Sequence, residues 1–154
     1  MIYEVRTYTL RPGTVAEFED RFAKRKPLRE KHSALGAFWH TDFGPLNQVI
    51  HAWPYENLQH RTAVRDAMAK DTALQQLPGG RDLIVEQQSD IMIPAPFMQP
   101  LGSRDFGTGN FYEMRSTPTR RATCPRAWRR GARPSPPGRS SRRWRRAGPA
   151  TSGR

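Results

Sequence analysis

The hydrophobic and polar positions at the start of the chain alternate, and this alternation predicts a β-strand over residues 1–10. One face of that strand carries Ile2, Glu4, Arg6, Tyr8 and Leu10, and the other carries Tyr3, Val5, Thr7 and Thr9. Pro12 and Gly13 then end the strand. Because Glu4 and Arg6 stand two residues apart on one face, we expect them to form an ion pair, with a polar anchor for a ligand as the alternative.

A helical spacing of apolar residues follows and predicts a helix over about residues 14–32. Thr14, with Glu17 three residues later, has the form of a capping box, so we expect the helix to begin there. Pro27 is expected to end or kink this helix, because proline has no N–H for the helical hydrogen bond.

Two further strands are predicted on either side of Gly44-Pro45, a dipeptide that favours a tight turn. The first covers residues 37–43 and the second covers residues 47–53. One face is expected to hold Phe38, His40 and Asp42 from the first strand and Asn47, Val49, His51 and Trp53 from the second. The two histidines should then be neighbours on opposite strands. Pro54 is expected to end the second strand, because it cannot donate to the sheet.

The remaining pattern predicts a helix over residues 56–70, a break at Pro78-Gly79-Gly80 and a fourth strand over residues 82–93. One face of the fourth strand is expected to carry Leu83, Val85, Ile91 and Ile93. The order β-α-β-β-α-β is typical of an α+β fold of the ferredoxin-like type, in which both helices cover one face of an antiparallel sheet.

The other face of this sheet is expected to be free of helices and to carry Phe, Trp, Val and His side chains. A sheet face of that composition is seldom left in contact with water, so we expect a second sheet to cover it. The pattern therefore predicts a homodimer that forms through the open face of the sheet.

Composition divides the chain near residue 115. Residues 1–115 contain 14 basic and 14 acidic side chains, whereas residues 116–154 contain 12 arginines and neither lysine nor an acidic residue. The last segment also has no Leu, Ile, Val, Phe, Met or Tyr, so it is expected to be disordered. We predict a domain over residues 1–94, a connector rich in Pro and Gly over residues 95–109, and a basic tail over residues 116–154.

A short repeat marks residues 110–115. Tyr3-Glu4-Val5-Arg6 recurs as Tyr112-Glu113-Met114-Arg115, 109 positions later, which indicates the start of a second unit of the same kind. After that the composition is what GC-rich DNA gives when it is translated out of frame, and we interpret the tail as a frameshift product. A tail that binds nucleic acid or a membrane surface through charge is the alternative, although we expect no specific nucleic-acid binding.

Cys124 is the single cysteine, so no disulfide within the chain is predicted. No apolar run approaches the length of a membrane span. Glu4 and Arg6 fall within a strand pattern and not in the apolar core of a signal peptide. We therefore expect a cytoplasmic protein without a membrane span.

Candidate functional residues gather in the predicted hairpin and the first strand. A candidate pocket is formed by Tyr8, His40, Asn47, His51 and Trp53, with Glu4 and Arg6 as possible polar anchors. Two imidazoles can bind a metal or transfer protons, but the interpretation that we favour is hydrogen-bonded histidines that line a barrel. No further ligand stands at a suitable spacing and no nucleotide-binding motif is present, so we predict no metal and no cofactor.

Three segments of the chain resemble the NIPSNAP family. They cover residues 2–13, 36–41 and 44–55 and read IYEVRTYTLRPG, GAFWHT and GPLNQVIHAWPY. The resemblance extends over about residues 1–94, with a partial second copy at residues 110–115. It implies a dimeric α/β barrel built from ferredoxin-like units, often two in one chain, and no agreed enzymatic chemistry. Eukaryotic members associate with mitochondria and with vesicle-trafficking or mitophagy partners.

Two functions follow from these observations. The first is a binding or scaffold module without catalysis, whose small-molecule ligand the sequence does not identify. The alternative is a cofactor-free monooxygenase or an isomerase-like enzyme of the wider dimeric α/β-barrel superfamily. Such an enzyme would use a cleft that holds Tyr8, His40 and His51. An open pocket containing these side chains would favour the enzyme, and a filled barrel would favour the module.

Overall fold

The computed structural model describes residues 1–103 and 110–117 of the chain. The chain divides into one unit over Met1–Ser116, which contains the described fold, and a second unit over Thr117–Arg154. The predictions for residues 104–109 and 118–154, which include most of the tail, lie outside the described residues. Within the described part, no helix has the length and apolar character needed to cross a lipid bilayer.

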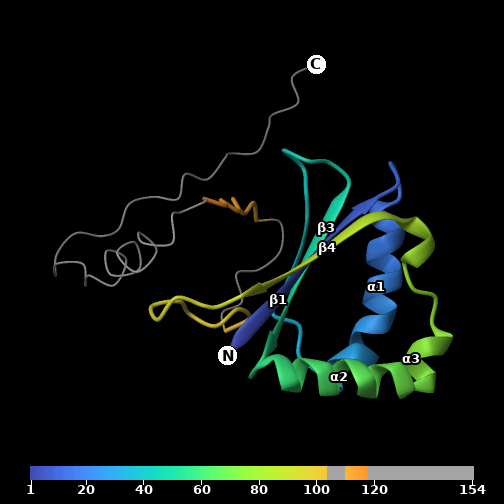
Figure 1. The fold of residues 1–154 in the computed structure, drawn as a ribbon. Helices are drawn as coiled ribbons and strands as arrows, with labels where there is room; N and C mark the ends of the chain where they lie inside the picture. Colours follow the sequence, from blue (N-terminus) through green and yellow to red (C-terminus); the bar gives the residue numbers. More distant parts are fainter. Residues whose placement is uncertain (104–109, 118–154) are drawn as a thin grey trace. The chain divides into compact units, whose positions relative to one another are not determined.

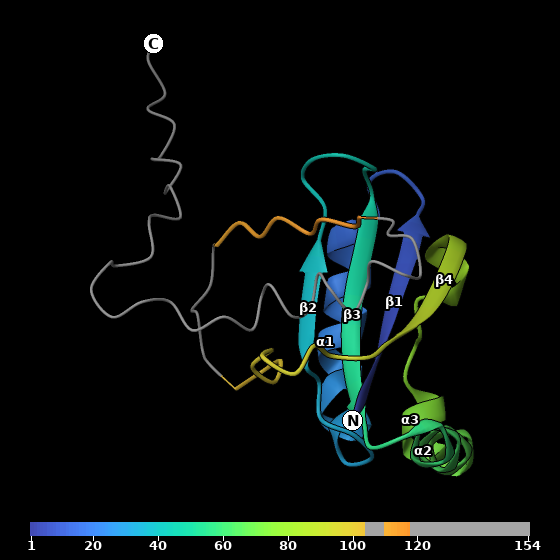
Figure 2. The same ribbon diagram turned by 60° about the vertical axis from the view of Figure 1, so that its left-hand side comes forward.

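A four-stranded antiparallel sheet with helices on one side forms the described fold (Figure 1). The elements follow in the order β1 (Ile2–Leu10), α1 (Val15–Glu30), β2 (Ala37–His40), β3 (Gln48–Tyr55), α2 (Leu58–Lys70), α3 (Thr72–Gln76), the 3-10 turn η1 (Arg81–Leu83) and β4 (Ile84–Met92). The strands lie in the order β2-β3-β1-β4, and Figure 2 shows them next to one another in front of α1. This arrangement confirms the predicted α+β fold of the ferredoxin-like type.

The ends of the helices differ from the predicted ones in their capping. At the start of α1, Thr14 makes no side-chain cap, and its hydroxyl instead donates to the carbonyl of Arg11 at 2.7 Å. The capping box is therefore wrong. The helix also continues through Pro27 to Glu30, so this proline does not end it, although its missing N–H removes one helical hydrogen bond. In α2, by contrast, the side chain of Asn57 accepts from the backbone N–H of His60.

Strand β3 continues past Pro54, which the sequence predicted as its end. The carbonyl of Ala52 accepts from the N–H of Gly36 at 2.9 Å, so the backbone groups of Ala52 point toward β2. The backbone groups of Pro54, two residues further along, point to the same side, but the pairing of β2 with β3 does not extend beyond Ala52. The missing N–H of Pro54 therefore removes no bond from the sheet.

The side chains that we assigned to the open face lie on the face that the helices cover, so that assignment is wrong. The ring of Phe22 in α1 lies 4.5 Å from the ring of Phe38, 5.5 Å from His51 and 6.3 Å from Trp53, between centroids. Val49 is fully buried in a cluster with Leu10, Phe18 and Leu83. Alternation sorts residues into two sets, but it does not state which set meets the helices.

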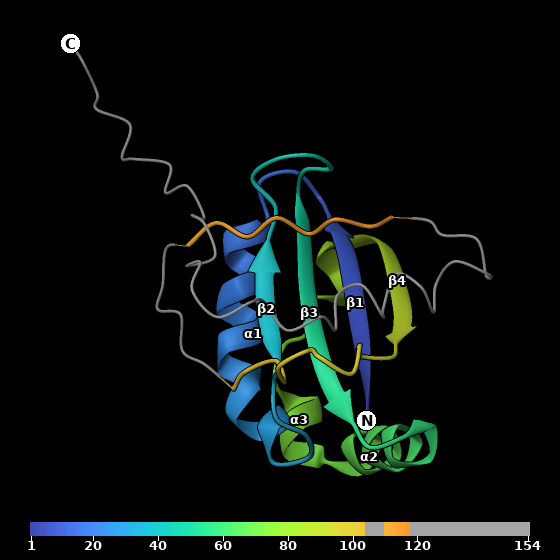
Figure 3. The ribbon, with the colours of Figure 1, turned by 90° about the vertical axis from the view of Figure 1, so that its left-hand side faces the viewer.

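The open face carries Tyr3, Val5 and Ala52, all buried, and is partly covered by the chain itself. Residues 94–103 return across this face, as Figure 3 shows for the yellow segment. The N–H of Leu101 donates to the hydroxyl of Tyr3 at 3.2 Å. At Gly36 a Cβ would lie 3.1 Å from the carbonyl oxygen of Ala52 and 3.3 Å from the Cβ of Leu101, so only glycine fits there without a shift.

Strand β4 also departs from its predicted pattern. A register shift next to Leu10 pairs that residue with Ile84, and Leu83 lies buried in η1. Val85 and Ile93 are 67% and 69% exposed. The predicted apolar face is thus interrupted, because a bulge reverses the side to which the following residues point.

Candidate binding site

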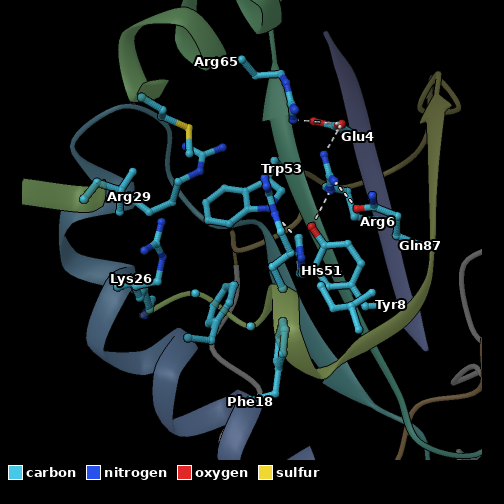
Figure 4. Close-up of a pocket in the computed structure, with 18 of the residues that line it drawn as sticks. Glu4, Arg6, Tyr8, Phe18, Lys26, Arg29, His51, Trp53, Arg65 and Gln87 are labelled. Atoms are coloured by element: carbon cyan, nitrogen blue, oxygen red, sulfur yellow. Dashed lines mark hydrogen bonds and ion pairs between the residues drawn. The ribbon is translucent and has the colours of Figure 1, made fainter. Parts of the chain in front are cut away.

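A pocket of about 980 Å³ opens between the helix-facing side of the sheet and the helices (Figure 4). Strands β1, β3 and β4 supply its floor, and the three α-helices, with residues 79–81, supply its walls. Its main lining residues are Glu4, Arg6, Tyr8, Phe18, Phe22, Lys26, Arg29, His51, Trp53, Arg65, Met68, Leu74, Ile84 and Gln87. The structure therefore brings together five of the seven predicted site residues.

Glu4 lies at the floor of the pocket and is 1% exposed. Its Oε1 accepts from Nη2 of Arg61 at 2.5 Å, from Oγ of Ser89 at 2.8 Å and from Nη1 of Arg6 at 3.3 Å. Burial by itself raises the pKa of Glu4, but the hydrogen bonds from Arg61 and Ser89 and the charge of Arg6 outweigh it, so the pKa is lowered. The predicted Glu4–Arg6 ion pair is present, and this carboxylate is a weak base.

Arg6 connects Glu4 to a tyrosine that faces the pocket. Its Nε donates to Oη of Tyr8 at 2.8 Å, and its Nη2 donates to Oε1 of Gln87 at 3.3 Å. Because a phenol has one proton and the Arg6 bond uses an oxygen lone pair, the Tyr8 hydroxyl keeps its proton for another acceptor.

His51 is neutral and held in one tautomer. It is 4% exposed, and its Nδ1 lies 2.6 Å from Nε1 of Trp53. An indole N–H can only donate, so Nδ1 accepts and the proton of the neutral ring is on Nε2. Burial, together with the charges of Arg6 and Arg29, lowers the pKa of His51 to about 3. At neutral pH this histidine is a hydrogen-bond donor and cannot accept a second proton readily.

Arg29 completes the site from the last turn of α1. Its guanidinium carbon lies 3.9 Å from the centroid of the Trp53 ring, and its Nη2 donates to Oη of Tyr55 at 3.0 Å. Burial lowers the pKa of Arg29, and the contact with Tyr55 acts against this. Sequence reasoning missed this residue, although Phe18, Phe22 and Arg29 follow the spacing of one helix face and extending that stripe would have found it.

His40 and Asn47 lie outside the pocket. Nδ1 of His40 lies 2.7 Å from Oε1 of Glu19, and its side chain is 45% exposed. Asn47 has a φ of 56° and serves the turn, where its carbonyl accepts from the N–H of Leu10. The two histidines are not paired, because the register places His51 opposite Phe38. Among the residues that the structure describes, no group of three His, Cys, Asp or Glu side chains is arranged to hold a metal ion.

The strand order, with helices on one side of an antiparallel sheet and a pocket between them, defines a ferredoxin-like α+β protein. The sequence profile of the NIPSNAP family matches residues 3–99, and the chain belongs to that family. It is 41% identical over 100 residues to the human Protein NipSnap homolog 3A, covering 63% of this chain and 40% of the human protein. The chain thus spans about two fifths of the length of that relative.

Solved structures agree with this assignment. An uncharacterized NIPSNAP-like domain protein from Burkholderia xenovorans is 34% identical, with a TM-score of 0.60 and coverage of 65% of this chain and 90% of that one. A NIPSNAP family protein with unknown function from Agrobacterium tumefaciens is 31% identical, with a TM-score of 0.61 and coverage of 66% and 93%. The described unit therefore corresponds to nearly the whole of each bacterial chain.

Proposed function

We propose that this protein is a binding module that holds a small organic molecule in the pocket between the sheet and the helices. The observation that carries this proposal is the pocket itself. Its volume of about 980 Å³ is at the upper end of the range of small-molecule sites. Its floor is polar and organised by hydrogen bonds, and its walls include aromatic and aliphatic side chains.

The state of the polar groups favours binding over catalysis. An open pocket with Tyr8 and His51 meets part of the condition that we set for an enzyme. General base catalysis needs a group that can accept a proton near neutral pH. His51 has its acceptor nitrogen engaged with Trp53, and the Glu4 carboxylate is held by three donors. These groups are suited to orient a ligand, and not to remove a proton from it.

The proposal includes pairing of two copies through the open face of the sheet. Trp39 and Ile50, opposite each other in the register, lie on this face and are half-buried. Tyr112 contributes a ring that lies 6.3 Å from the Trp39 ring, between centroids. Static light scattering at micromolar concentration tests the dimer.

We also infer a cytoplasmic location from the single cysteine. From the composition we infer a second unit that stops after residue 115.

A pocket-filling substitution tests ligand binding. Ala67 and Ala69 are both exposed residues of α2, but only Ala69 lines the pocket, at its rim. We expect the neutral dye Nile red to bind the full chain with increased emission, Ala69→Trp to abolish the increase, and Ala67→Trp to retain it. Circular dichroism verifies that both variants are folded. Equal dye binding by the folded Ala69→Trp variant would place the dye elsewhere and refute the pocket as the binding site.

A further inference from the structure

The geometry points to a specific class of ligand. We propose that the pocket binds a molecule with an anionic oxygen head, a carboxylate or a phosphate, on an apolar body, and that Arg29 receives the head. This inference rests on the proposed binding function and adds the chemistry of the ligand to it.

Arg29 has an unmet hydrogen-bonding requirement. The residue is 9% exposed, and its Nη1 is buried without a hydrogen-bond partner among the residues that the structure describes. Buried donors in native proteins nearly always have an acceptor, and one that is left unpaired destabilises the folded state. Nε of Arg61 is a second such atom, but Arg61 does not line the pocket. Arg29 is therefore the unpaired donor next to the cavity.

The guanidinium of Arg29 is fixed in position before any ligand arrives. Its carbon lies over the Trp53 ring and its Nη2 donates to the Tyr55 hydroxyl, so the position of Nη1 is fixed as well. A planar cation that is already ordered loses little conformational entropy when it forms a further hydrogen bond. The neighbouring Glu4 does not meet the requirement: its Oε1 accepts from Arg6, Arg61 and Ser89, while Nη1 of Arg29 has no partner among the described residues.

The other polar groups that line the cavity also favour an anionic ligand. The lining contains six cationic side chains (Arg6, Arg25, Lys26, Arg29, Arg65 and Arg81) against three acidic ones (Glu4, Asp66 and Glu86). Residues 1–115 as a whole have equal numbers of basic and acidic side chains, so this excess is local to the pocket. Tyr8 adds a hydroxyl proton and His51 adds Nε2–H, and both are donors. A donor-rich, cationic lining complements an acceptor-rich anion.

The remaining walls indicate that the ligand has an apolar body. Phe18, Phe22, Met68, Leu74 and Ile84 line the cavity around the cationic groups. Phe18 and Leu74 are already buried, whereas Phe22, Met68 and Ile84 are partly exposed. A bare inorganic anion would leave the exposed parts of these three side chains in water, whereas an aromatic or aliphatic body attached to the head would cover them.

A set of matched naphthalene compounds tests the inference. Isothermal titration of the full chain at physiological salt compares 2-naphthoate, 2-naphthyl phosphate and neutral 2-naphthalenemethanol, which share one ring system. We expect at least one anion to bind about tenfold or more tightly than the alcohol, as a charge-assisted hydrogen bond allows. The tighter of the two anions identifies the head as a carboxylate or a phosphate.

The Arg29→Met variant shows whether Arg29 receives the head. We expect this variant to lose the preference for the anion while its affinity for the alcohol stays within about twofold. Arg11→Met, an exposed arginine outside the pocket, is the control, and both variants keep the 12 arginines of residues 116–154. An anion preference that survives in Arg29→Met would overturn the inference, because the head would then lie elsewhere.

Two further outcomes separate this inference from the proposed function. If the anions and the alcohol bind wild-type protein equally, the anion inference fails while pocket binding stands. If neither these compounds nor Nile red bind, the proposed function itself fails. Should Arg29→Met not fold, wild-type protein labelled with ¹⁵N-arginine supplies the answer. The tighter anion must shift the Arg29 side-chain resonance, assigned with Arg29→Lys, and an unmoved resonance overturns the inference.

Discussion

The two faces of the sheet use buried side chains in opposite ways. The helix-facing side buries charged and polar groups, including Glu4 and His51, around an open pocket. The open side buries Tyr3, Val5 and Ala52, and the returning segment near Leu101 covers part of it. The side that would ordinarily be a filled core is thus the side with a cavity. In this protein the helices form the walls of a site as well as the cover of a core.

The hydrophobic core on the helix-facing side is divided into two clusters of buried residues. One buried cluster joins Leu10, Phe18, Val49 and Leu83. The other joins Trp53, Tyr55 and Val64. Phe22 packs against both clusters, and the pocket is lined from each of them. A core in two parts leaves room for a ligand where a single cluster would have closed the space.

The largest expected effect contrasts neighbouring residues on the two faces. Val49→Asp buries an unpaired charge in the cluster around Leu10, and we expect a loss of at least about 3 kcal/mol in unfolding free energy. Ile50→Asp, on the open face, should keep the fold and reduce dimerisation. Thermal melts followed by circular dichroism, with light scattering, measure both. Unfolding of Ile50→Asp with an intact Val49→Asp would mean that the faces are assigned the wrong way round.

A smaller effect compares the two copies of the Tyr-Glu-x-Arg sequence. Glu4→Gln removes a buried charge that holds Arg6 and Arg61, and should lower the unfolding free energy by about 2 kcal/mol. Glu113→Gln acts on an exposed ion pair, in which Arg115 lies 2.7 Å away, and should have no measurable effect. Urea unfolding of both variants provides the values. Equal losses would show that burial does not distinguish the two pairs.

Protonation of His51 gives a third, pH-dependent effect. Its pKa is lowered from 6.5 to about 3 in the folded protein, so the unfolded chain binds more protons between these values. Stability is therefore expected to fall as the pH drops below 6.5, by about 2 kcal/mol between pH 7 and pH 5. The lowered pKa of Glu4 contributes only below the ordinary value of 4.5.

Urea unfolding at pH 7 and pH 5 isolates the His51 contribution. His51→Gln should lose this part of the pH dependence, while His40→Gln, a change at an exposed histidine, should retain it. A wild-type slope that persists in His51→Gln would assign the titration to another group.

The smallest expected effect lies at the edge of the open face. Leu101→Ala removes part of the side chain next to Gly36 and leaves the Leu101 N–H bond to Tyr3 in place. We expect a loss of about 1 kcal/mol or less, because Leu101 is only half-buried. A melting temperature lowered as much as in Glu4→Gln would mean that the returning segment is part of the main core.

Sequence reasoning predicted the order of the elements along the chain and the alternating residue sets of β1 and β3, because period-two patterns depend only on the local backbone. It could not assign the sets to faces, since that choice depends on Phe18 and Phe22 arriving from a helix. Glu4, Arg6, Tyr8, His51 and Trp53 were found because they share one sheet face. Arg29 was not, because it belongs to another element and its role arises only in the folded chain.

The misplaced residues have equally physical explanations. His40 has the correct parity, but β2 ends there and leaves the side chain near Glu19 and solvent. Asn47 fits the alternation predicted from the sequence, but its backbone is left-handed and it belongs to the turn. Pro54 remains in a strand because its neighbour on that side is already absent. In each case the place where a strand begins or ends decided the outcome, and sequence patterns locate such boundaries poorly.

The pocket draws all of its lining residues from Glu4 to Gln87, within one ferredoxin-like unit. The proposed binding site therefore predicts one ligand for each unit, whatever the state of association. Diluting the protein should leave the intrinsic affinity of each site unchanged, since no group of a second copy is needed to form it. A chain with two complete units would have two binding sites. It would therefore bind a surface that carries several ligand molecules more tightly than a chain with one site does.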